Sequence, residues 1–192
     1  MKNNIKIAIL ISGTGSNAIE IMKYFDHHKK IKVEKLLSNK INEAIKSKCQ
    51  DFNVGFQILD NNKITNTSYL ISKIPNTEID CVILAGYLKK IPEGFIRHFS
   101  NKIINLHPSL LPKYGGKGMY GANVHKAVLK AKEKESGITI HYVNEEFDKG
   151  KIIAQFKFSI EKEENLETIQ KKIQVLEHKN FSKVIEKVLH DS

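Results

Sequence analysis

The chain has 192 residues, of which 41% are hydrophobic and 27% charged, and this composition is typical of one globular domain. No run approaches the roughly 20 apolar residues of a membrane span, and no signal-peptide pattern is present, so we expect a cytoplasmic protein. The formal net charge is +10, but it comes from scattered lysines, and Arg97 is the only arginine. Because proteins that read nucleic acids usually also use arginine, the charge argues against a nucleic-acid partner.

The first half of the chain alternates short apolar runs with helical patterns. Strands are predicted over residues 5–11, 33–37, 56–59, 81–85 and 103–106. Helices are predicted between them, over residues 17–25, 42–52, 68–74 and 92–99. This alternation predicts an α/β fold with a doubly wound, mostly parallel sheet. Ligands of such sheets bind at the carboxyl ends of the strands, so we expect the site in the loops after the first, fourth and fifth strands.

The second half has a different pattern. A helix is predicted over residues 122–132, and strands over 138–143 and 152–160. The loop between these strands is too short for a helical crossover, so they should form an antiparallel pair. A long C-terminal helix begins near Asn165 and carries an apolar stripe. This stripe either packs inward or meets a second subunit, which leaves a homodimer open.

Two cysteines, Cys49 and Cys81, lie far apart without a CxxC spacing or a neighbouring histidine cluster. We therefore expect reduced cysteines and neither a disulfide nor a zinc site.

The run Ser12-Gly13-Thr14-Gly15-Ser16-Asn17 follows the first strand. Small residues let the backbone approach a ligand, and the N–H groups of the next helix favour an anion such as phosphate. The run lacks the lysine of a Walker loop and the third glycine of a dinucleotide fingerprint. The alternative is a structural turn that binds nothing.

The run Asn105-Leu106-His107-Pro108-Ser109-Leu110-Leu111-Pro112 comes at the end of the fifth strand. Strand alternation puts Asn105 and His107 on one face, and Pro108 stops the strand beside them. An amide and an imidazole together can stabilise an oxyanion and handle a proton, which suits attack on a carbonyl. A histidine that simply satisfies its hydrogen bonds beside a turn is the alternative.

The acidic loop Asn144-Glu145-Glu146-Phe147-Asp148-Lys149-Gly150 joins the two late strands. Asp148 could approach His107 and favour its imidazolium form. A solvated acidic loop without a function is the alternative.

These three runs, with Leu84-Ala85-Gly86-Tyr87 and the run from Gly137 to Val143, occur in an order that resembles the folate-dependent phosphoribosylglycinamide formyltransferase family. The resemblance covers nearly the whole chain. It implies a Rossmann-like formyltransferase fold in one domain, residues 1–192, with a phosphoribosyl-binding half (1–100) and a catalytic and folate-binding half (101–192). The implied reaction moves a formyl group from the co-substrate 10-formyltetrahydrofolate to the amine of glycinamide ribonucleotide, in purine synthesis, without a metal.

The resemblance also implies roles for individual residues. Asn105 would stabilise the oxyanion of a tetrahedral intermediate, while His107, kept protonated by Asp148, would support that charge and assist proton transfer. The residues implied in phosphoribosyl binding are Gly15, Ser16, Asn17, Gln174 and Glu177. The residues implied in folate binding are Leu88, Lys89, Lys90, Ile91, Asn105, Asn144, Glu145, Glu146, Phe147 and Asp148.

Two features depart from the family. The arginine that often precedes the fourth strand and meets the glutamate tail of folate is missing, so Lys63 or another lysine would have to replace it. The run Gly115-Gly116-Lys117-Gly118-Met119-Tyr120-Gly121 is longer and richer in glycine than in simple members. It could cradle phosphate or ribose, or it could form a mobile lid.

Two other hypotheses compete with this function, and the second hypothesis is another enzyme that uses the same folate. Transfer-RNA formyltransferases and formyltetrahydrofolate hydrolases share the Asn, His and Asp residues, but each carries a further domain for which this chain has no room. An inactive nucleotide- or folate-binding module is the third hypothesis, and the presence of Asn105, His107 and Asp148 argues against it.

Overall fold

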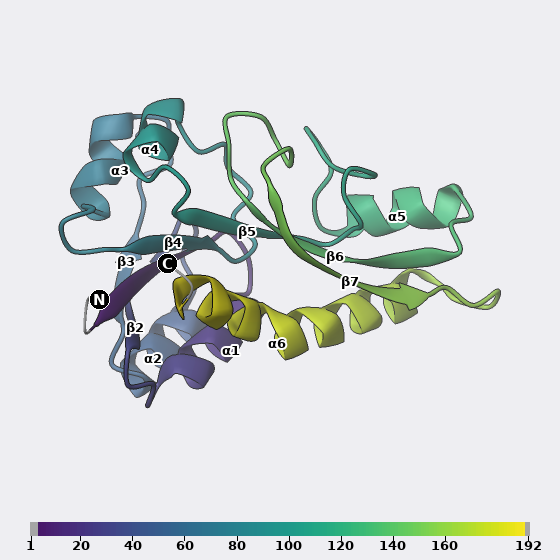
Figure 1. Cartoon of the computed structure of the whole chain (residues 1–192), viewed down its shortest axis with the longest axis horizontal. Coiled ribbons are helices and arrows are strands. Elements are labelled where there is room, and N and C mark those ends of the chain that lie inside the picture. The colour runs from purple at the N-terminus through teal and green to yellow at the C-terminus, as the bar shows by residue number, and fades with distance from the viewer. Residues whose placement is uncertain (1–3, 191–192) are drawn as a thin grey trace.

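The computed structural model describes residues 4–190. Its centre is a seven-stranded sheet in the order β3-β2-β1-β4-β5-β6-β7 (Figure 1). The first five strands of that order run parallel, whereas β6 is antiparallel to both β5 and β7. The strands are β1 (Ile5–Ile11), β2 (Ile31–Ser38), β3 (Gly55–Ile58), β4 (Cys81–Leu84), β5 (Ile103–His107), β6 (Glu135–Tyr142) and β7 (Ile152–Ser159).

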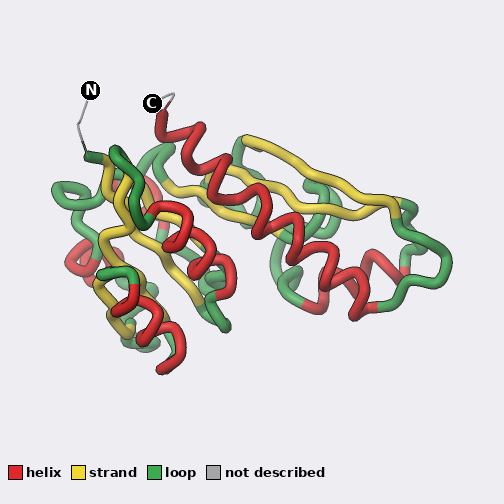
Figure 2. Tube along the Cα trace, turned by 90° about the horizontal axis from the view of Figure 1, so that it is seen from below, coloured by secondary structure: helices red, strands yellow, loops and turns green. Residues whose placement is uncertain are grey.

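Helices cover both faces of this sheet. They are α1 (Ser16–Phe25), α2 (Glu43–Asp51), α3 (Thr67–Lys73), α4 (Glu93–His98), α5 (Ala122–Lys130) and α6 (Leu166–His190). Helices α3 and α4 lie on one face, and α1, α2 and α6 lie on the other (Figure 1). Figure 2, which views the molecule from below, shows α6 running along the near face of the sheet, beside the late strands. The fold class predicted from the sequence is therefore confirmed.

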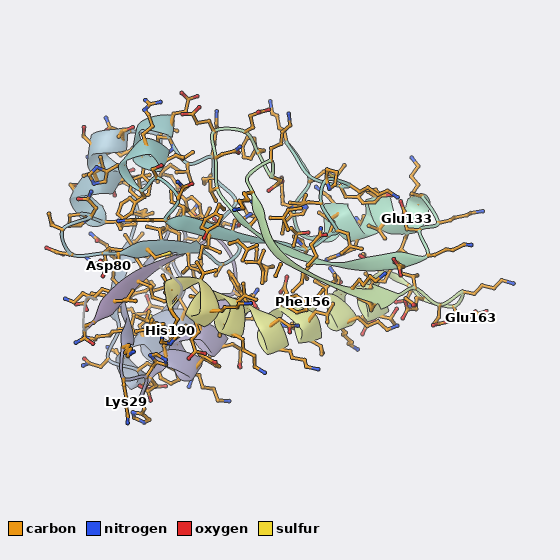
Figure 3. All side chains as sticks on the ribbon, in the orientation of Figure 1. Lys29, Asp80, Glu133, Phe156, Glu163 and His190 are labelled. Atoms are coloured by element: carbon orange, nitrogen blue, oxygen red, sulfur yellow. The ribbon has the colours of Figure 1, made fainter. Side chains whose placement is uncertain are left out.

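The strand β1 shows why the sheet is covered twice. Its alternate residues Ile7 and Ile9 pack into the core on the α1 and α6 side, whereas Ala8 and Leu10 pack into the core on the α3 and α4 side. All four are fully buried. Each large aliphatic side chain buried in this way contributes roughly 1.5–3 kcal/mol to stability. Phe156 of β7 lies against the core on the α6 side (Figure 3).

The apolar stripe of α6 packs inward. Ile169, Ile173, Phe181 and Ile185 are buried in the core shared with β1 and α1. The helix begins at Leu166 because the side chain of Asn165 accepts a hydrogen bond from the N–H of Thr168 at 3.1 Å. The stripe that could have supported a homodimer is thus used within the chain.

Element boundaries differ from the expectations at a few places. β5 extends to His107, one residue beyond the predicted end, and β6 begins at Glu135, ahead of the predicted start at residue 138. β6 is lengthened because its early residues pair with β7, as Glu135 does with Ser159. One continuous sheet joins the two halves of the expected domain, of which residues 1–3 and 191–192 lie outside the described range.

Both cysteines are free and buried. Burial raises the pKa of Cys49 to about 11 and that of Cys81 to about 12, so both thiols stay protonated and unreactive at neutral pH.

Among residues 4–190, no helix is long and apolar enough to span a bilayer.

Candidate active site

The site lies where the strand order reverses, between β1 and β4. The loops that follow these two strands are tied together by Ser12. Its hydroxyl accepts a hydrogen bond from the N–H of Leu88 at 2.9 Å, and its own N–H donates to the carbonyl of Gly86 at 3.1 Å. Ser12 is 1% exposed, so these bonds are shielded from water and hold the two loops in fixed positions.

A cavity of about 780 Å³ opens at this edge of the sheet. Its walls come from the loops after β1 and β4, the end of β5, the glycine-rich segment before α5, and one face of α6. A smaller cavity of about 80 Å³ adjoins it, between the loop after β4 and the loop between β6 and β7. The residues that line both cavities are Tyr87, Lys89, Asn105, Phe147 and Asp148.

The turn before α1 requires a glycine. Gly15 has φ of 79°, a left-handed conformation, and a Cβ there would lie 2.8 Å from the Cδ1 atom of Ile45. No side chain caps the helix, so its first-turn N–H groups have no side-chain acceptor. Such a helix end is an anion-binding site because the unpaired N–H groups and the helix dipole favour negative charge. Gly15, Ser16 and Asn17 line the large cavity, as expected.

Asn17 and Glu177 connect α1 with α6 inside this cavity. The Nδ2 of Asn17 donates to Oε2 of Glu177 at 2.9 Å, while the Oδ1 of Asn17 is buried without a partner. Burial raises the pKa of Glu177, and the hydrogen bond from Asn17 opposes that shift. Gln174 lies one turn earlier on α6 and lines the same wall. The five residues expected to bind a phosphoribosyl group therefore lie together.

Asn105, His107 and Asp148 also meet. Asn105 and His107 come from one face of β5, and Asp148 comes from the loop between β6 and β7. The Oδ2 of Asp148 lies 3.5 Å from Nδ1 of His107 and accepts a hydrogen bond from the N–H of Gly116 at 2.8 Å. On the other side of the ring, Nε2 of His107 lies 2.8 Å from the carbonyl oxygen of Tyr114. An imidazolium, with a hydrogen on each nitrogen, would satisfy both acceptors.

The two neighbours that face His107 have strained backbones. Tyr114 and Asp148 both have φ of 57°, in the left-handed region that costs a non-glycine residue about 1 kcal/mol or more. Residues of this kind persist where the surrounding structure holds them, and they concentrate at functional sites. Here they place a carbonyl and a carboxylate on opposite sides of one buried imidazole.

Two histidines that were not predicted from the sequence also lie at the site. His141 of β6 pairs in register with Asn105, and the Asn105 Nδ2 lies 3.0 Å from its Nε2. His125 of α5 is buried, lines the large cavity and has an Nδ1 without a partner. Burial lowers the pKa of both histidines, and nearby His107 lowers it further. The one clue in the sequence was that His141 lies on a predicted strand, two residues after Thr139. A single strand does not show which strand it pairs with, so the position of His141 beside Asn105 could not be predicted.

The residues expected to bind folate lie around the smaller cavity. Its lining includes Lys89, Lys90, Ile91 and the five residues Asn144, Glu145, Glu146, Phe147 and Asp148. Leu88 is the exception, because it lines the large cavity and is half exposed. Lys63, the suggested replacement for the missing arginine, lines neither cavity and instead pairs with Asp60 at 3.7 Å.

The glycine-rich segment before α5 forms part of the wall of the large cavity, from Gly116 to Gly121. Gly116, Gly118 and Gly121 have positive φ values of 98°, 87° and 53°. The segment is attached to the site through the hydrogen bond between Gly116 and Asp148.

Within residues 4–190, one group of histidine and acidic side chains is close enough to hold a metal ion: His28, Glu186 and His190. It lies near the C-terminal end of α6, outside both cavities (Figure 3). The Nδ1 of His28 accepts from the N–H of Ile31 at 2.9 Å, so its Nε2 carries the hydrogen and faces Glu186 at 3.1 Å. A protonated Nε2 cannot ligate a metal, so the geometry indicates a hydrogen-bonded contact between the loop after α1 and α6.

A switch-point cavity with an uncapped helix end beside an amide, an imidazole and a carboxylate defines a group-transfer enzyme of the doubly wound α/β class. The chain belongs to the formyl transferase family, whose sequence profile matches residues 5–185.

Relatives and solved structures agree with this assignment. The chain is 32% identical to phosphoribosylglycinamide formyltransferase of Bacillus subtilis over 96% of this chain and 94% of that protein. The crystal structure of phosphoribosylglycinamide formyltransferase from Anaplasma phagocytophilum superposes with a TM-score of 0.87 at 28% identity, over 97% of this chain and 87% of that one. The chain spans 60% of the length of the chloroplastic enzyme of Vigna unguiculata, to which it is 37% identical, and the match covers 94% of this chain.

Proposed function

We propose that the protein transfers the formyl group of 10-formyltetrahydrofolate to the amine of glycinamide ribonucleotide. The observation that carries the proposal is that Asn105 and Asp148 line both cavities. A donor held in one cavity and an acceptor held in the other would meet beside these two residues and His107. The names of the relatives support the same reaction.

The acceptor fits the large cavity. Its phosphate would bind the N–H groups at Gly15, Ser16 and Asn17, which have no side-chain cap. Its ribose hydroxyls would bind Glu177 and the unpartnered Oδ1 of Asn17, because a buried acceptor without a donor is costly unless a ligand supplies one. Gln174 would add a further hydrogen bond from the same wall.

The donor would lie across the mouth of the smaller cavity, which at about 80 Å³ is too small to enclose it. Leu88 and Ile91 offer apolar surface to an aromatic ring system, and the loop from Asn144 to Asp148 closes the opposite side. Lys89 lines both cavities, and it would meet an anionic tail in place of Lys63.

In the proposed reaction the amine nitrogen attacks the formyl carbon and forms a tetrahedral intermediate. The N–H of Asn105 and the imidazolium of His107 would stabilise its oxyanion. Asp148 would stabilise the imidazolium charge at 3.5 Å. The intermediate collapses when the bond between carbon and N10 of folate breaks. The amine loses one proton and N10 gains one, so no net proton is consumed. For His107 to assist this transfer, its Nε2 must leave the carbonyl of Tyr114.

The partners follow from this proposal. They are the two small molecules, with no role assigned to nucleic acid, membrane or a second subunit. Because both cysteines are free and protonated, we also propose a reducing compartment such as the cytoplasm.

The test is a formyl-transfer assay with the purified protein, 10-formyltetrahydrofolate and glycinamide ribonucleotide, followed by absorbance. The expected result is loss of the formyl group that requires the acceptor and that collapses in His107→Ala. Loss without the acceptor would indicate a hydrolase, and loss that requires initiator transfer RNA would indicate the transfer-RNA enzyme. Donor binding without turnover under all three conditions would refute an enzymatic function.

A further inference from the structure

His141 is buried directly beside the amide of Asn105. The two residues are partners across the antiparallel pair of β5 and β6, and Nδ2 of Asn105 lies 3.0 Å from Nε2 of His141. Only 2% of His141 is exposed. Nothing in the proposed reaction requires this ring to touch either substrate, so the contact needs its own explanation.

The hydrogen bonds of His141 define its tautomer. Its Nδ1 lies 2.8 Å from the carbonyl oxygen of Tyr142, which can only accept, so Nδ1 carries a hydrogen. In a neutral ring Nε2 then has a lone pair. The charged groups facing the ring are Asp148, with Oδ1 at 3.7 Å, and His107. Asp148 favours a second proton, but burial has the larger effect and lowers the pKa of His141.

A lone pair on Nε2 allows one orientation of the Asn105 amide. With nitrogen toward the ring, one N–H of Asn105 donates to Nε2. With oxygen toward the ring, two acceptors would face each other at 3.0 Å, which is repulsive. The amide nitrogen has a second hydrogen, and among the described residues no acceptor takes it.

We propose that His141 is a positioning residue, which holds the Asn105 amide so that an N–H, and not the carbonyl oxygen, points at the developing oxyanion. This inference rests on the proposed function. An oxyanion-hole donor contributes about 10²- to 10³-fold to kcat, so a flipped amide would remove that factor and add a repulsive oxygen. Without His141 the amide samples both orientations, and the expected loss is about 10- to 100-fold.

Two substitutions separate this role from a structural one. In His141→Gln the side-chain oxygen can reach the place of Nε2 and accept from Asn105, while the bond to Tyr142 is lost. In His141→Asn the shorter amide can replace Nδ1 and donate to Tyr142, while Asn105 loses its acceptor. We expect kcat of His141→Gln to stay within about 5-fold of wild type, whereas kcat of His141→Asn falls about 10- to 100-fold with both KM values unchanged. A larger loss of kcat in His141→Gln than in His141→Asn would overturn the proposal, because it would show that the ring acts through its hydrogen bond to Tyr142.

A double-mutant cycle tests the coupling directly. In the Asn105→Ala background there is no amide to position, so His141→Asn should cost less than about 2-fold in kcat. Full additivity of the two losses would overturn the proposal. His178→Asn, on a half-buried histidine of α6 outside both cavities, is the matched control and should leave kcat unchanged. Thermal melting of each variant separates loss of folding from loss of kcat.

A final measurement does not depend on turnover. The ¹⁵N chemical shifts of the imidazole in labelled wild-type protein at pH 7 report which nitrogen carries hydrogen. We expect a neutral His141 with hydrogen on Nδ1 alone. Hydrogen on Nε2, in either a neutral ring or an imidazolium, would overturn the positioning role even if formyl transfer is found. Absence of formyl transfer with the expected shifts would refute the proposed function and leave the orientation of Asn105 intact.

Discussion

Oδ2 of Asp148 lies 3.5 Å from Nδ1 of His107 and at the same time accepts the N–H of Gly116 at 2.8 Å. One carboxylate oxygen thus connects the imidazole at the end of β5 with the glycine-rich wall of the large cavity. Asp148 has φ of 57°, so its side chain is directed inward by a backbone conformation that the loop must hold at some cost. The charge of Asp148 and the shape of its loop are therefore separable contributions to the site.

The charge of Asp148 can be removed at nearly constant size. We expect Asp148→Asn to lower kcat about 10²- to 10³-fold, because the imidazolium of His107 loses its counter-charge. Steady-state kinetics with both substrates would measure this. Asp51→Asn, an exposed carboxylate of α2 that lies outside both cavities and pairs with Lys48, serves as the control and should change kcat less than about 2-fold. Equal losses in the two variants would refute a specific role of Asp148.

The shape of the loop depends on Gly150. A Cβ at this position would overlap the carbonyl oxygen of Tyr142, so Gly150→Ala must displace the turn that carries Asp148. We expect a loss of about 2–4 kcal/mol of stability, measured by denaturant unfolding, together with a lower kcat. Lys149→Ala, an exposed substitution in the same turn, should stay within about 0.5 kcal/mol of wild type. An unchanged midpoint in Gly150→Ala would contradict the close packing of Gly150 against Tyr142.

Glu177 is a buried acid whose pKa is raised mainly by burial. A folded-state pKa above the unfolded value means that the stability contribution is complete below the unfolded pKa and is lost as the pH rises through the folded pKa. Glu177→Gln removes the ionisation, so we expect it to raise the Tm at pH 7 by about 2–4 °C and to give no advantage near pH 4. Differential scanning calorimetry at the two pH values would check this.

The same substitution should weaken binding of the acceptor. We expect the Kd of Glu177→Gln for glycinamide ribonucleotide to rise about 10-fold, because a hydrogen bond from the ribose to a carboxylate is stronger than one to an amide. Isothermal titration calorimetry measures this affinity. An unchanged Kd together with a raised Tm would show that Glu177 contacts Asn17 but does not bind the acceptor.

Lys89 and Lys63 can be compared as candidates for the missing arginine. Lys89 lines both cavities, whereas Lys63 is exposed and pairs with Asp60. We expect Lys89→Ala to raise KM for a folate donor about 3- to 10-fold, with an effect that shrinks at high salt, and Lys63→Ala to leave it unchanged. Acceptor KM should stay constant in both. A larger effect in Lys63→Ala would place the glutamate tail elsewhere.

The sequence by itself determined the elements and their layers. The alternation of short apolar runs with helical patterns predicted a doubly wound sheet, and the cores on its two faces confirm it. The Gly15 turn and the pair of Asn105 and His107 on one strand face could also be predicted, because strand alternation and glycine conformations are local properties.

Only the tertiary structure decided how distant segments meet. That β6 joins β5, and so places His141 against Asn105, depends on strand pairing between segments with no local signature. The packing of the loops and of α6 likewise decides that Lys63 lies outside both cavities and that Asn17 pairs with Glu177. The physical reason is that periodicity and turn chemistry act within about ten residues of chain, whereas a site is assembled by burial, which acts across the whole sheet.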